Sequence, residues 1–341
     1  MCINLEPPSN VEISEIAALY GLKVKAIRSC RKVWQLETDH GFKYLKLTRF
    51  DPTALTFIYE ALEYLHQRGL TPVPRLNLTR LGNPWINYQA QHYFMTDWFF
   101  STELDFRLAS DLQLAVAYLA EFHQRSSGFT PSQANYRTEW WGWSEKFRTR
   151  LQQLEQFASL AAQEETYFSQ TYLEYFETYY QEAVASYQSL LAAPYQEVAN
   201  VAAENRSFCH HDYSARNLLR TSDHQLVLID YEYCLRDLRI HDLINLILRN
   251  LRHQHWEIGV CRYILEIYHA KNHLTPEEIE LMWVIMNWPQ DFWQIGLQYY
   301  NEKQPWSNAR FEERLLTRQL MQAKRQEFLR QFPRENGIYE F

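Results

Sequence analysis

HHDYSARN at residues 210–217 and LVLIDYE at residues 226–232 are the most informative stretches of this chain. Asn217 follows Asp212 by five residues, and Asp230 follows Asn217 by thirteen. Transfer of a phosphoryl group from ATP requires a carboxylate at the acceptor hydroxyl and oxygen ligands that hold Mg²⁺ against the phosphates. The two stretches supply both kinds of side chain, which indicates phosphoryl-transfer chemistry.

The residues between Asn217 and Asp230 predict a short β-hairpin, because a polar turn separates two leucines from the apolar run at residues 226–229. Such a hairpin brings Asn217 and Asp230 side by side, so that both side chains reach one cation. Asp212 begins the preceding loop and is the first catalytic candidate. His210 is the second, and we expect it to point inward and to hydrogen-bond this loop.

An isolated H-x-D triplet is common in proteins and mostly structural. The complete H-x-D-x-x-x-x-N pattern, followed by an apolar strand that ends in aspartate, rarely arises by chance, so the phosphotransferase interpretation is favoured. These residues resemble the catalytic loop and metal-binding aspartate of the protein-kinase-like superfamily. The chain is similar to its aminoglycoside phosphotransferase (APH) branch and, within that branch, to spore coat proteins of the CotS and YutH type. W-G-W at residues 141–143 and NWPQDFWQ at residues 287–294 extend the resemblance over nearly the full chain.

This resemblance implies an α+β fold of the bilobal, kinase-like type. A small lobe with an antiparallel sheet, residues 1–99, would bind the nucleotide. A larger and mostly helical lobe, residues 100–341, would carry the catalytic loop and the acceptor site. The resemblance also implies ATP and Mg²⁺ as cofactors, with Asn217 and Asp230 as metal ligands and Asp212 orienting or deprotonating an acceptor alcohol.

Alternating apolar residues predict three antiparallel strands at residues 23–27, 33–37 and 42–47. On the third strand Tyr44 and Lys46 share one face, because side chains two residues apart point to the same side of a sheet. A lysine on a strand is usually just solvated. The resemblance gives Lys46 a second role, in which it projects into the cleft and contacts the phosphates of ATP.

An apolar stripe predicts a helix over residues 54–68 that ends at Gly69. In the resembled fold a glutamate on this helix pairs with the strand lysine. Glu60 and Glu63 both lie off the stripe, and the alternative role of either is that of an exposed helix charge. Glu63 is the weakly preferred partner of Lys46, from its separation along the chain.

FMTDWFF at residues 94–100 resembles the hinge of this fold, where backbone groups of Asp97 to Phe99 meet the adenine edge. Asp97 and Phe99 are therefore candidate nucleotide-binding residues. The turn at residues 29–32 departs from the family pattern, because it reads Ser-Cys-Arg-Lys where related enzymes often carry a glycine. Either Arg31 and Lys32 replace backbone donors to the phosphates, or the turn no longer grips a nucleotide well.

Length and composition agree with two lobes and exclude several classes of partner. A chain of 341 residues with 46% hydrophobic residues can bury a sizeable core. The net charge of −7 and the absence of a long Lys/Arg run argue against nucleic acid as a partner. No apolar run of about 18 residues and no secretory leader are apparent, so we expect no membrane partner and a cytoplasmic protein. The spore-coat resemblance implies incorporation into the coat, with coat proteins as partners.

The five cysteines are scattered and form no C-x-x-C pair, so neither a disulfide framework nor a zinc site is expected. In the C-terminal region, aromatic residues crowd between positions 283 and 306. An aromatic core between helices is the favoured interpretation, and an acceptor-binding wall is the alternative. His123 is predicted to be a packing histidine, and Asp242 matches the aspartate that braces the catalytic loop in the resembled family.

Two functions remain open from the sequence. The first is an ATP-dependent kinase of an unidentified small molecule, favoured over a protein kinase because Tyr231 and Glu232 stand where protein kinases have Phe-Gly and no A-P-E follows. The second is a spore coat scaffold that keeps the fold with little or no turnover, since a fold does not establish activity. The enzyme is favoured by intact Lys46, Asp212, Asn217 and Asp230. The scaffold is favoured by the turn without glycine and by the unsettled glutamate partner of Lys46.

Overall fold

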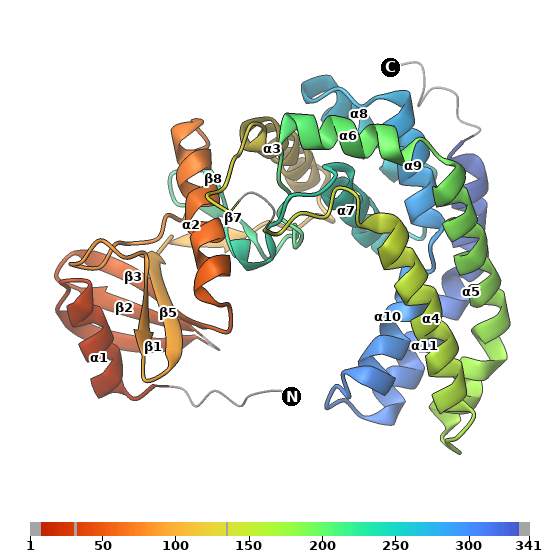
Figure 1. The fold of residues 1–341 in the computed structure, drawn as a ribbon, viewed down its shortest axis with the longest axis horizontal. Coiled ribbons are helices and arrows are strands. Elements are labelled where there is room, and N and C mark those ends of the chain that lie inside the picture. The colour runs from red at the N-terminus through yellow and green to blue at the C-terminus, as the bar shows by residue number, and fades with distance from the viewer. Residues whose placement is uncertain (1–7, 31–32, 134–135, 334–341) are drawn as a thin grey trace. The chain divides into compact units, whose positions relative to one another are not determined.

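The computed structural model describes residues 8–30, 33–133 and 136–333 (Figure 1). The chain divides into two compact units, each assembled from separate segments. The first unit contains Met1–Asp105, Arg125–Arg137 and His210–Cys234, and the second contains Phe106–Gln124, Thr138–Cys209 and Leu235–Phe341. The limit of the first unit therefore does not coincide with the boundary predicted after residue 99. The physical reason is strand pairing, which joins residues 218–228 to residues 101–103.

The first unit is built on a five-stranded antiparallel sheet with the strand order β1-β2-β3-β5-β4. The three strands predicted from alternation are confirmed. The hairpin between β2 and β3 turns at Gly41, whose φ of +85° lies in the region that glycine adopts most readily. The strands are β1 (Val24–Cys30), β2 (Val33–Thr38), β3 (Gly41–Thr48), β4 (Trp85–Tyr88) and β5 (Gln91–Asp97).

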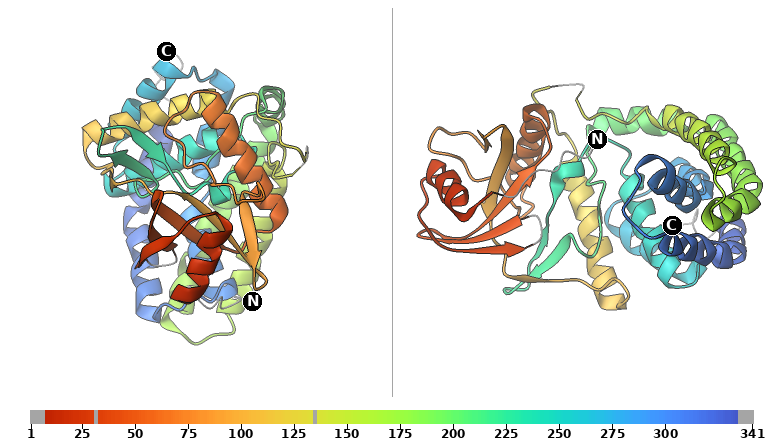
Figure 2. Two further views of the ribbon diagram at one scale, coloured as in Figure 1. Left: turned by 90° about the vertical axis from the view of Figure 1, so that its left-hand side faces the viewer. Right: turned by 90° about the horizontal axis from the view of Figure 1, so that it is seen from below.

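The two faces of this sheet carry different residues, and a different helix covers each (Figure 2). Helix α1 (Asn10–Leu19) packs on the face that holds Trp34, Leu36 and Leu45, which are all buried. Helix α2 (Pro52–Gln67) borders a cavity on the opposite face. Lys46 lines that cavity, as expected from its place on the strand face opposite Leu45.

A second, three-stranded sheet has the order β6-β7-β8 and belongs to the same unit. Its strands are β6 (Ser101–Glu103), β7 (Leu218–Thr221) and β8 (Leu226–Leu228). The hairpin predicted between Asn217 and Asp230 is thereby confirmed. Its turn is held by Thr221, whose hydroxyl donates to the Asp223 carboxylate at 2.6 Å.

The second unit is helical. Its elements are α3 (Ala109–Ser126, whose last two residues belong to the first unit), α4 (Trp143–Ala161), α5 (Tyr167–Ala192), α6 (Tyr195–Asn205), α7 (Ile240–His253), α8 (Ile258–Lys271), α9 (Pro276–Asn287), α10 (Gln290–Gly296), the π-helical turn Leu297–Asn301 and α11 (Asn308–Gln331). Helix α9 begins with a capping box, in which Thr275 is the N-cap residue and Glu278 stands at the third helical position. No helix among the described residues is both long and apolar enough to cross a lipid bilayer.

The aromatic residues of the second unit form a packed core, in agreement with the favoured interpretation. Phe292 stacks on Tyr172 and on Tyr179, with ring centroids 4.3 and 4.4 Å apart. Trp288 and Tyr300 are also buried. Stacked rings at these separations are an attractive arrangement for buried aromatic side chains, so these residues hold α5 against the C-terminal helices.

Candidate functional site

The loop that carries Asp212 is closed by Asn217. The Asn217 amide Nδ2 donates to the carboxylate Oδ2 of Asp212 at 2.9 Å and to its backbone carbonyl at 2.8 Å. The backbone N–H of Ile229 donates to the Asn217 carbonyl at 2.8 Å. These bonds connect Asp212, Asn217 and the residue before Asp230 within one unit of the fold.

His210 fixes the same loop from inside. The side chain is fully buried, and its Nδ1 accepts from the backbone N–H of Asp212 at 3.2 Å. The proton of the neutral ring therefore lies on Nε2, which donates to the Ile229 carbonyl at 2.9 Å. The expected inward orientation of His210 is confirmed, and its contacts are those of a positioning residue that joins the loop to the hairpin.

Two residues of this region have left-handed backbone conformations. His211 and Asp230 both have a φ of 66°. Residues other than glycine rarely adopt this conformation, and it persists only where the surrounding structure imposes it, at a cost of about 1–3 kcal/mol each. At Asp230 the conformation turns the chain from the hairpin into the short 3₁₀ helix Tyr231–Tyr233.

Lys46 and two acidic residues form a compact charged cluster. The Lys46 Nζ lies 2.8 Å from the Asp230 carboxylate and 2.6 Å from the Glu232 carboxylate. Burial alone would lower the pKa of Lys46, but Tyr44, Glu232 and Asp230 together more than offset it and raise that pKa above its ordinary value. Lys46 is therefore a fixed positive charge. Burial also raises the pKa of Tyr44 to about 12.

Glu63, the weakly preferred partner of Lys46, pairs with a different residue. Its carboxylate accepts two bonds from the Arg75 guanidinium, at 2.7 and 2.6 Å. Glu60 accepts from the backbone N–H of Ser132 at 2.9 Å. Lys46 therefore pairs with Glu232 and not with Glu63 as expected. Glu232 follows the hairpin directly, which brings its carboxylate to the Lys46 side chain. Two acids spaced as D-x-E at positions 230 and 232 were the sequence signal for this contact.

A cavity of about 470 Å³ lies in the first unit beside this charged cluster. Its lining includes Lys46, Asp230, Asp97 and Phe99. The side chains of Asp97 and Lys43 form an ion pair. The cavity therefore joins both predicted nucleotide-binding residues of the hinge to the charged cluster. Arg31 and Lys32, expected to contact phosphates, lie outside the described residues.

The hinge has backbone groups in an arrangement that can meet a flat heterocycle. The Asp97 carbonyl accepts a long bond of 3.2 Å from the Thr96 hydroxyl. The Trp98 N–H donates to the Phe42 carbonyl at 3.1 Å. The next N–H, that of Phe99, has no backbone acceptor within the part of the chain that the structure describes. Asp97 and Phe99, which carry this carbonyl and this N–H, both line the cavity.

The second unit contains a buried polar cluster that fits a structural role. His123 is 2% exposed, and its Nδ1 lies 2.7 Å from the Tyr268 hydroxyl. Its Nε2 lies 3.4 Å from the carboxylate of Asp242, which is fully buried. The prediction of a packing histidine is confirmed by these contacts.

Sequence comparison identifies relatives over most of the chain. The model of the phosphotransferase enzyme family APH matches residues 24–282. Spore coat protein S of Bacillus subtilis strain 168 is 26% identical over 333 residues, which make up 94% of this chain and 93% of that protein.

Solved structures share the fold over the same length. An aminoglycoside phosphotransferase from Alicyclobacillus acidocaldarius superposes with a TM-score of 0.81 at 19% identity, covering 100% of this chain and 99% of that one. A spectinomycin phosphotransferase in an AMP-bound complex has a TM-score of 0.60 at 13% identity, covering 91% and 94% of the two chains. An amicoumacin kinase in complex with AMP-PNP and Ca²⁺ has a TM-score of 0.56 at 14% identity, covering 95% and 94%. The predicted α+β, kinase-like fold of the APH type is confirmed.

Proposed function

Because the chain belongs to the phosphotransferase enzyme family APH, we propose that it transfers the γ-phosphoryl group of ATP to the alcohol group of a small molecule. The observation that carries this proposal is the charged cluster of Lys46, Asp230 and Glu232 at the wall of the hinge cavity. A nucleotide needs an apolar pocket for its base beside a charged site for its phosphates, and this unit contains both. The nucleotide complexes of structurally similar kinases support the assignment.

The base would bind at the hinge. The Asp97 carbonyl and the Phe99 N–H present an acceptor and a donor two residues apart, which matches the amino group and ring nitrogen of an adenine edge. Lys46, held as a permanent cation, would then contact the phosphates. Glu63 keeps Arg75 as its partner in this proposal and has no direct role at the nucleotide.

The donor set fits Mg²⁺, which prefers oxygen ligands from one or two carboxylates. Asp230 supplies a carboxylate, and Asn217 supplies a carbonyl oxygen, because its amide nitrogen is used by Asp212. When bound, the ion would neutralise charge on the transferring phosphoryl group. Asp212, hydrogen-bonded by Asn217 and positioned by His210, would orient the acceptor hydroxyl and receive its proton.

Calorimetric titration with ATP, with and without Mg²⁺, tests this proposal. We expect saturable binding that depends on Mg²⁺ in the parent protein, and weakened binding in Lys46→Met. The matched control is Lys25→Met, the same substitution at an exposed position of the same sheet. Absence of nucleotide binding in the parent would contradict the proposal.

A structural role in the spore coat is the second candidate, since Spore coat protein S is similar over 94% of this chain. The engagement of Lys46 by both acids in the structure also favours it, because a lysine held in this way must release a partner to serve a ligand. If the parent protein binds no nucleotide but assembles with coat proteins of a sporulating cell, the structural role is the function.

A further inference from the structure

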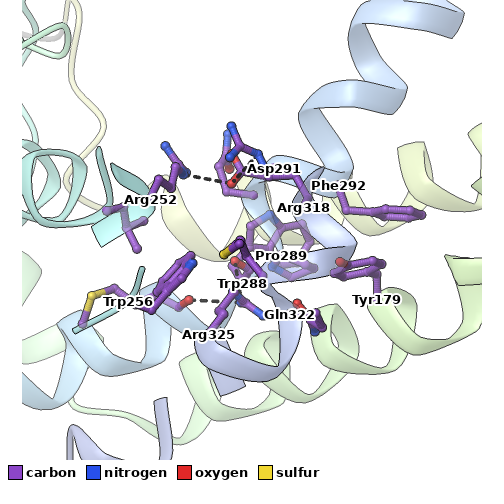
Figure 3. Close-up of a pocket in the computed structure, with 14 residues that line it drawn as sticks. Tyr179, Arg252, Trp256, Trp288, Pro289, Asp291, Phe292, Arg318, Gln322 and Arg325 are labelled. Carbon is purple, nitrogen blue, oxygen red and sulfur yellow. Dashed lines mark hydrogen bonds and ion pairs between the residues drawn. The ribbon is translucent and has the colours of Figure 1, made fainter. Parts of the chain in front are cut away.

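A small cavity in the second unit is lined by three arginine side chains (Figure 3). Arg252 comes from α7, and Arg318 and Arg325 come from α11. Among the described residues that line it, Asp291 is the one acid. The volume is about 30 Å³, and a water molecule needs roughly 10–15 Å³ by the same measure. The cavity therefore has room for a small ion but not for a sugar or a nucleotide.

Asp291 neutralises only one of the two arginines that it contacts. Its Oδ2 lies 2.8 Å from the Arg252 Nε and 3.4 Å from the Arg318 Nε, so one oxygen serves both guanidinium groups. Within the described part of the chain, neither arginine has another hydrogen bond or ion pair. Their terminal amino groups therefore retain several N–H donors without a protein acceptor.

Arg325 is balanced separately. Its guanidinium lies 2.7 Å from the Glu182 carboxylate and donates to the Asn287 carbonyl at 2.7 Å. The charge left over at the cavity is thus one positive unit, from two arginines and one aspartate. Burial lowers the pKa of Arg252, Asp291 opposes this shift, and the like charges of Arg318 and Arg249 add to it. Positive charge is in excess around this side chain.

A neutral donor at the cavity also lacks a partner. Trp288 is 3% exposed and lines the cavity, and its indole Nε1 has no hydrogen-bond acceptor among the described residues. Buried N–H groups are nearly always hydrogen-bonded, so an orphan donor points to a bound water, ion or ligand. This observation is independent of the arginine charges.

We propose that this cavity binds a small inorganic anion of the phosphate type, held by the terminal amino groups of Arg252 and Arg318. The guanidinium fork suits an oxyanion because two N–H groups meet two oxygens. The indole N–H of Trp288 is a further donor. Every residue named belongs to the second unit, so the site is separate from the cluster of Lys46 and Asp230.

Calorimetric titration with inorganic phosphate, at constant ionic strength and pH, tests the proposal on the full chain. Arg318→Gln removes the excess charge and should weaken phosphate binding about tenfold or more. Asp291→Asn raises the excess charge and should strengthen it. Arg330→Gln, the same substitution at an exposed position of the same helix, should leave the affinity unchanged. The Lys46→Met variant should also bind phosphate as the parent does, which separates this site from the nucleotide site.

Opposite effects of Arg318→Gln and Asp291→Asn distinguish an anion site from a purely structural ion network, because loss of a structural contact would impair both variants alike. Thermal unfolding in the presence of phosphate provides a second readout, with a rise in Tm expected for the parent and for Arg330→Gln. No saturable phosphate binding by the folded parent, or equal affinity in the parent and Arg318→Gln, would overturn the proposal.

Discussion

Asp230 in the first unit and Asp242 in the second are both aspartates paired with a basic side chain, yet they differ in what remains accessible. Asp242 is fully buried between His123 and His241. Burial alone would raise its pKa, but the bonds from the two histidines hold that pKa well below the ordinary value. The side chain of Asp230 is 30% exposed beside Lys46. A carboxylate enclosed by its partners serves stability, whereas one that is half-enclosed at a cavity can exchange a partner for a ligand.

The largest effect is expected from removing the enclosed carboxylate. Asp242→Ala removes the buried charged acceptor of two histidine hydrogen bonds and should lower the free energy of unfolding by about 3 kcal/mol or more, because the loss of a buried charged partner leaves its donors unsatisfied. Chemical denaturation of parent and variant measures this loss. A change below about 1 kcal/mol would remove the distinction between the two aspartates.

The next largest effect concerns catalysis and rests on the proposed function. Asp212→Ala should lower phosphate transfer roughly a hundredfold or more, because a positioned base is removed. Its affinity for Mg·ATP should change little, because Asp212 acts on the acceptor. Turnover requires an acceptor, which a screen of sugars, amino alcohols and aminoglycosides with the parent protein would supply. If transfer by the variant equals that of the parent, Asp212 has no catalytic duty.

Asp230→Asn tests the half-enclosed carboxylate directly. The substitution keeps the shape of the side chain but removes the charge that would hold Mg²⁺ against the phosphates. We expect Mg·ATP affinity to fall about tenfold while the unfolding free energy stays within about 1 kcal/mol of the parent. Equal affinity for Mg·ATP in the two proteins would refute Asp230 as a metal ligand.

The pH dependence of stability should identify His123. Burial lowers its pKa in the folded protein, so the unfolded chain binds a proton below about pH 6.5 that the folded chain does not. The contribution of neutral His123 to the free energy of unfolding is fully present above that pH. It is lost as the pH falls, by up to about 1.4 kcal/mol per pH unit. Unfolding at pH 7 and pH 5 should show a smaller difference for His123→Gln than for the parent. Protonation of Asp242 lowers the free energy of unfolding further, but only below about pH 4, because the pKa of this carboxyl is held below its ordinary value.

The smallest effect is expected at Glu63. Its pair with Arg75 is partly exposed, with side-chain exposures of 18% and 48%, and such pairs contribute about 0.2–1 kcal/mol. Glu63→Gln should therefore reduce stability by less than about 1 kcal/mol and leave Mg·ATP affinity within about twofold. A tenfold loss of affinity would restore Glu63 as the partner of Lys46 in the nucleotide-bound state.

The sequence predicted the elements better than the contacts between them. Alternation predicted β1 to β3, and the hairpin after Asn217 followed from its turn residues, because both signals are local. The sequence favoured Glu63 over Glu60 as the partner of Lys46, and the contact with Glu232 was not predicted, because it depends on how α2 and the hairpin approach the same strand. The arginine cavity had no local signal either, since Arg252 and Arg318 come from helices far apart in the sequence.

Because the first unit is assembled from separate segments of the chain, it cannot be completed until late in synthesis. The β7–β8 hairpin pairs with β6 only after more than a hundred intervening residues have been made. At typical elongation rates this interval is on the order of ten seconds. Until then the sheet of residues 24–97 lacks the segment that carries Asp212, Asn217 and Asp230. A nascent chain that ends before residue 230 therefore holds Lys46 without its two acidic partners, and an N-terminal fragment truncated there would have the five-stranded sheet but not the charged cluster.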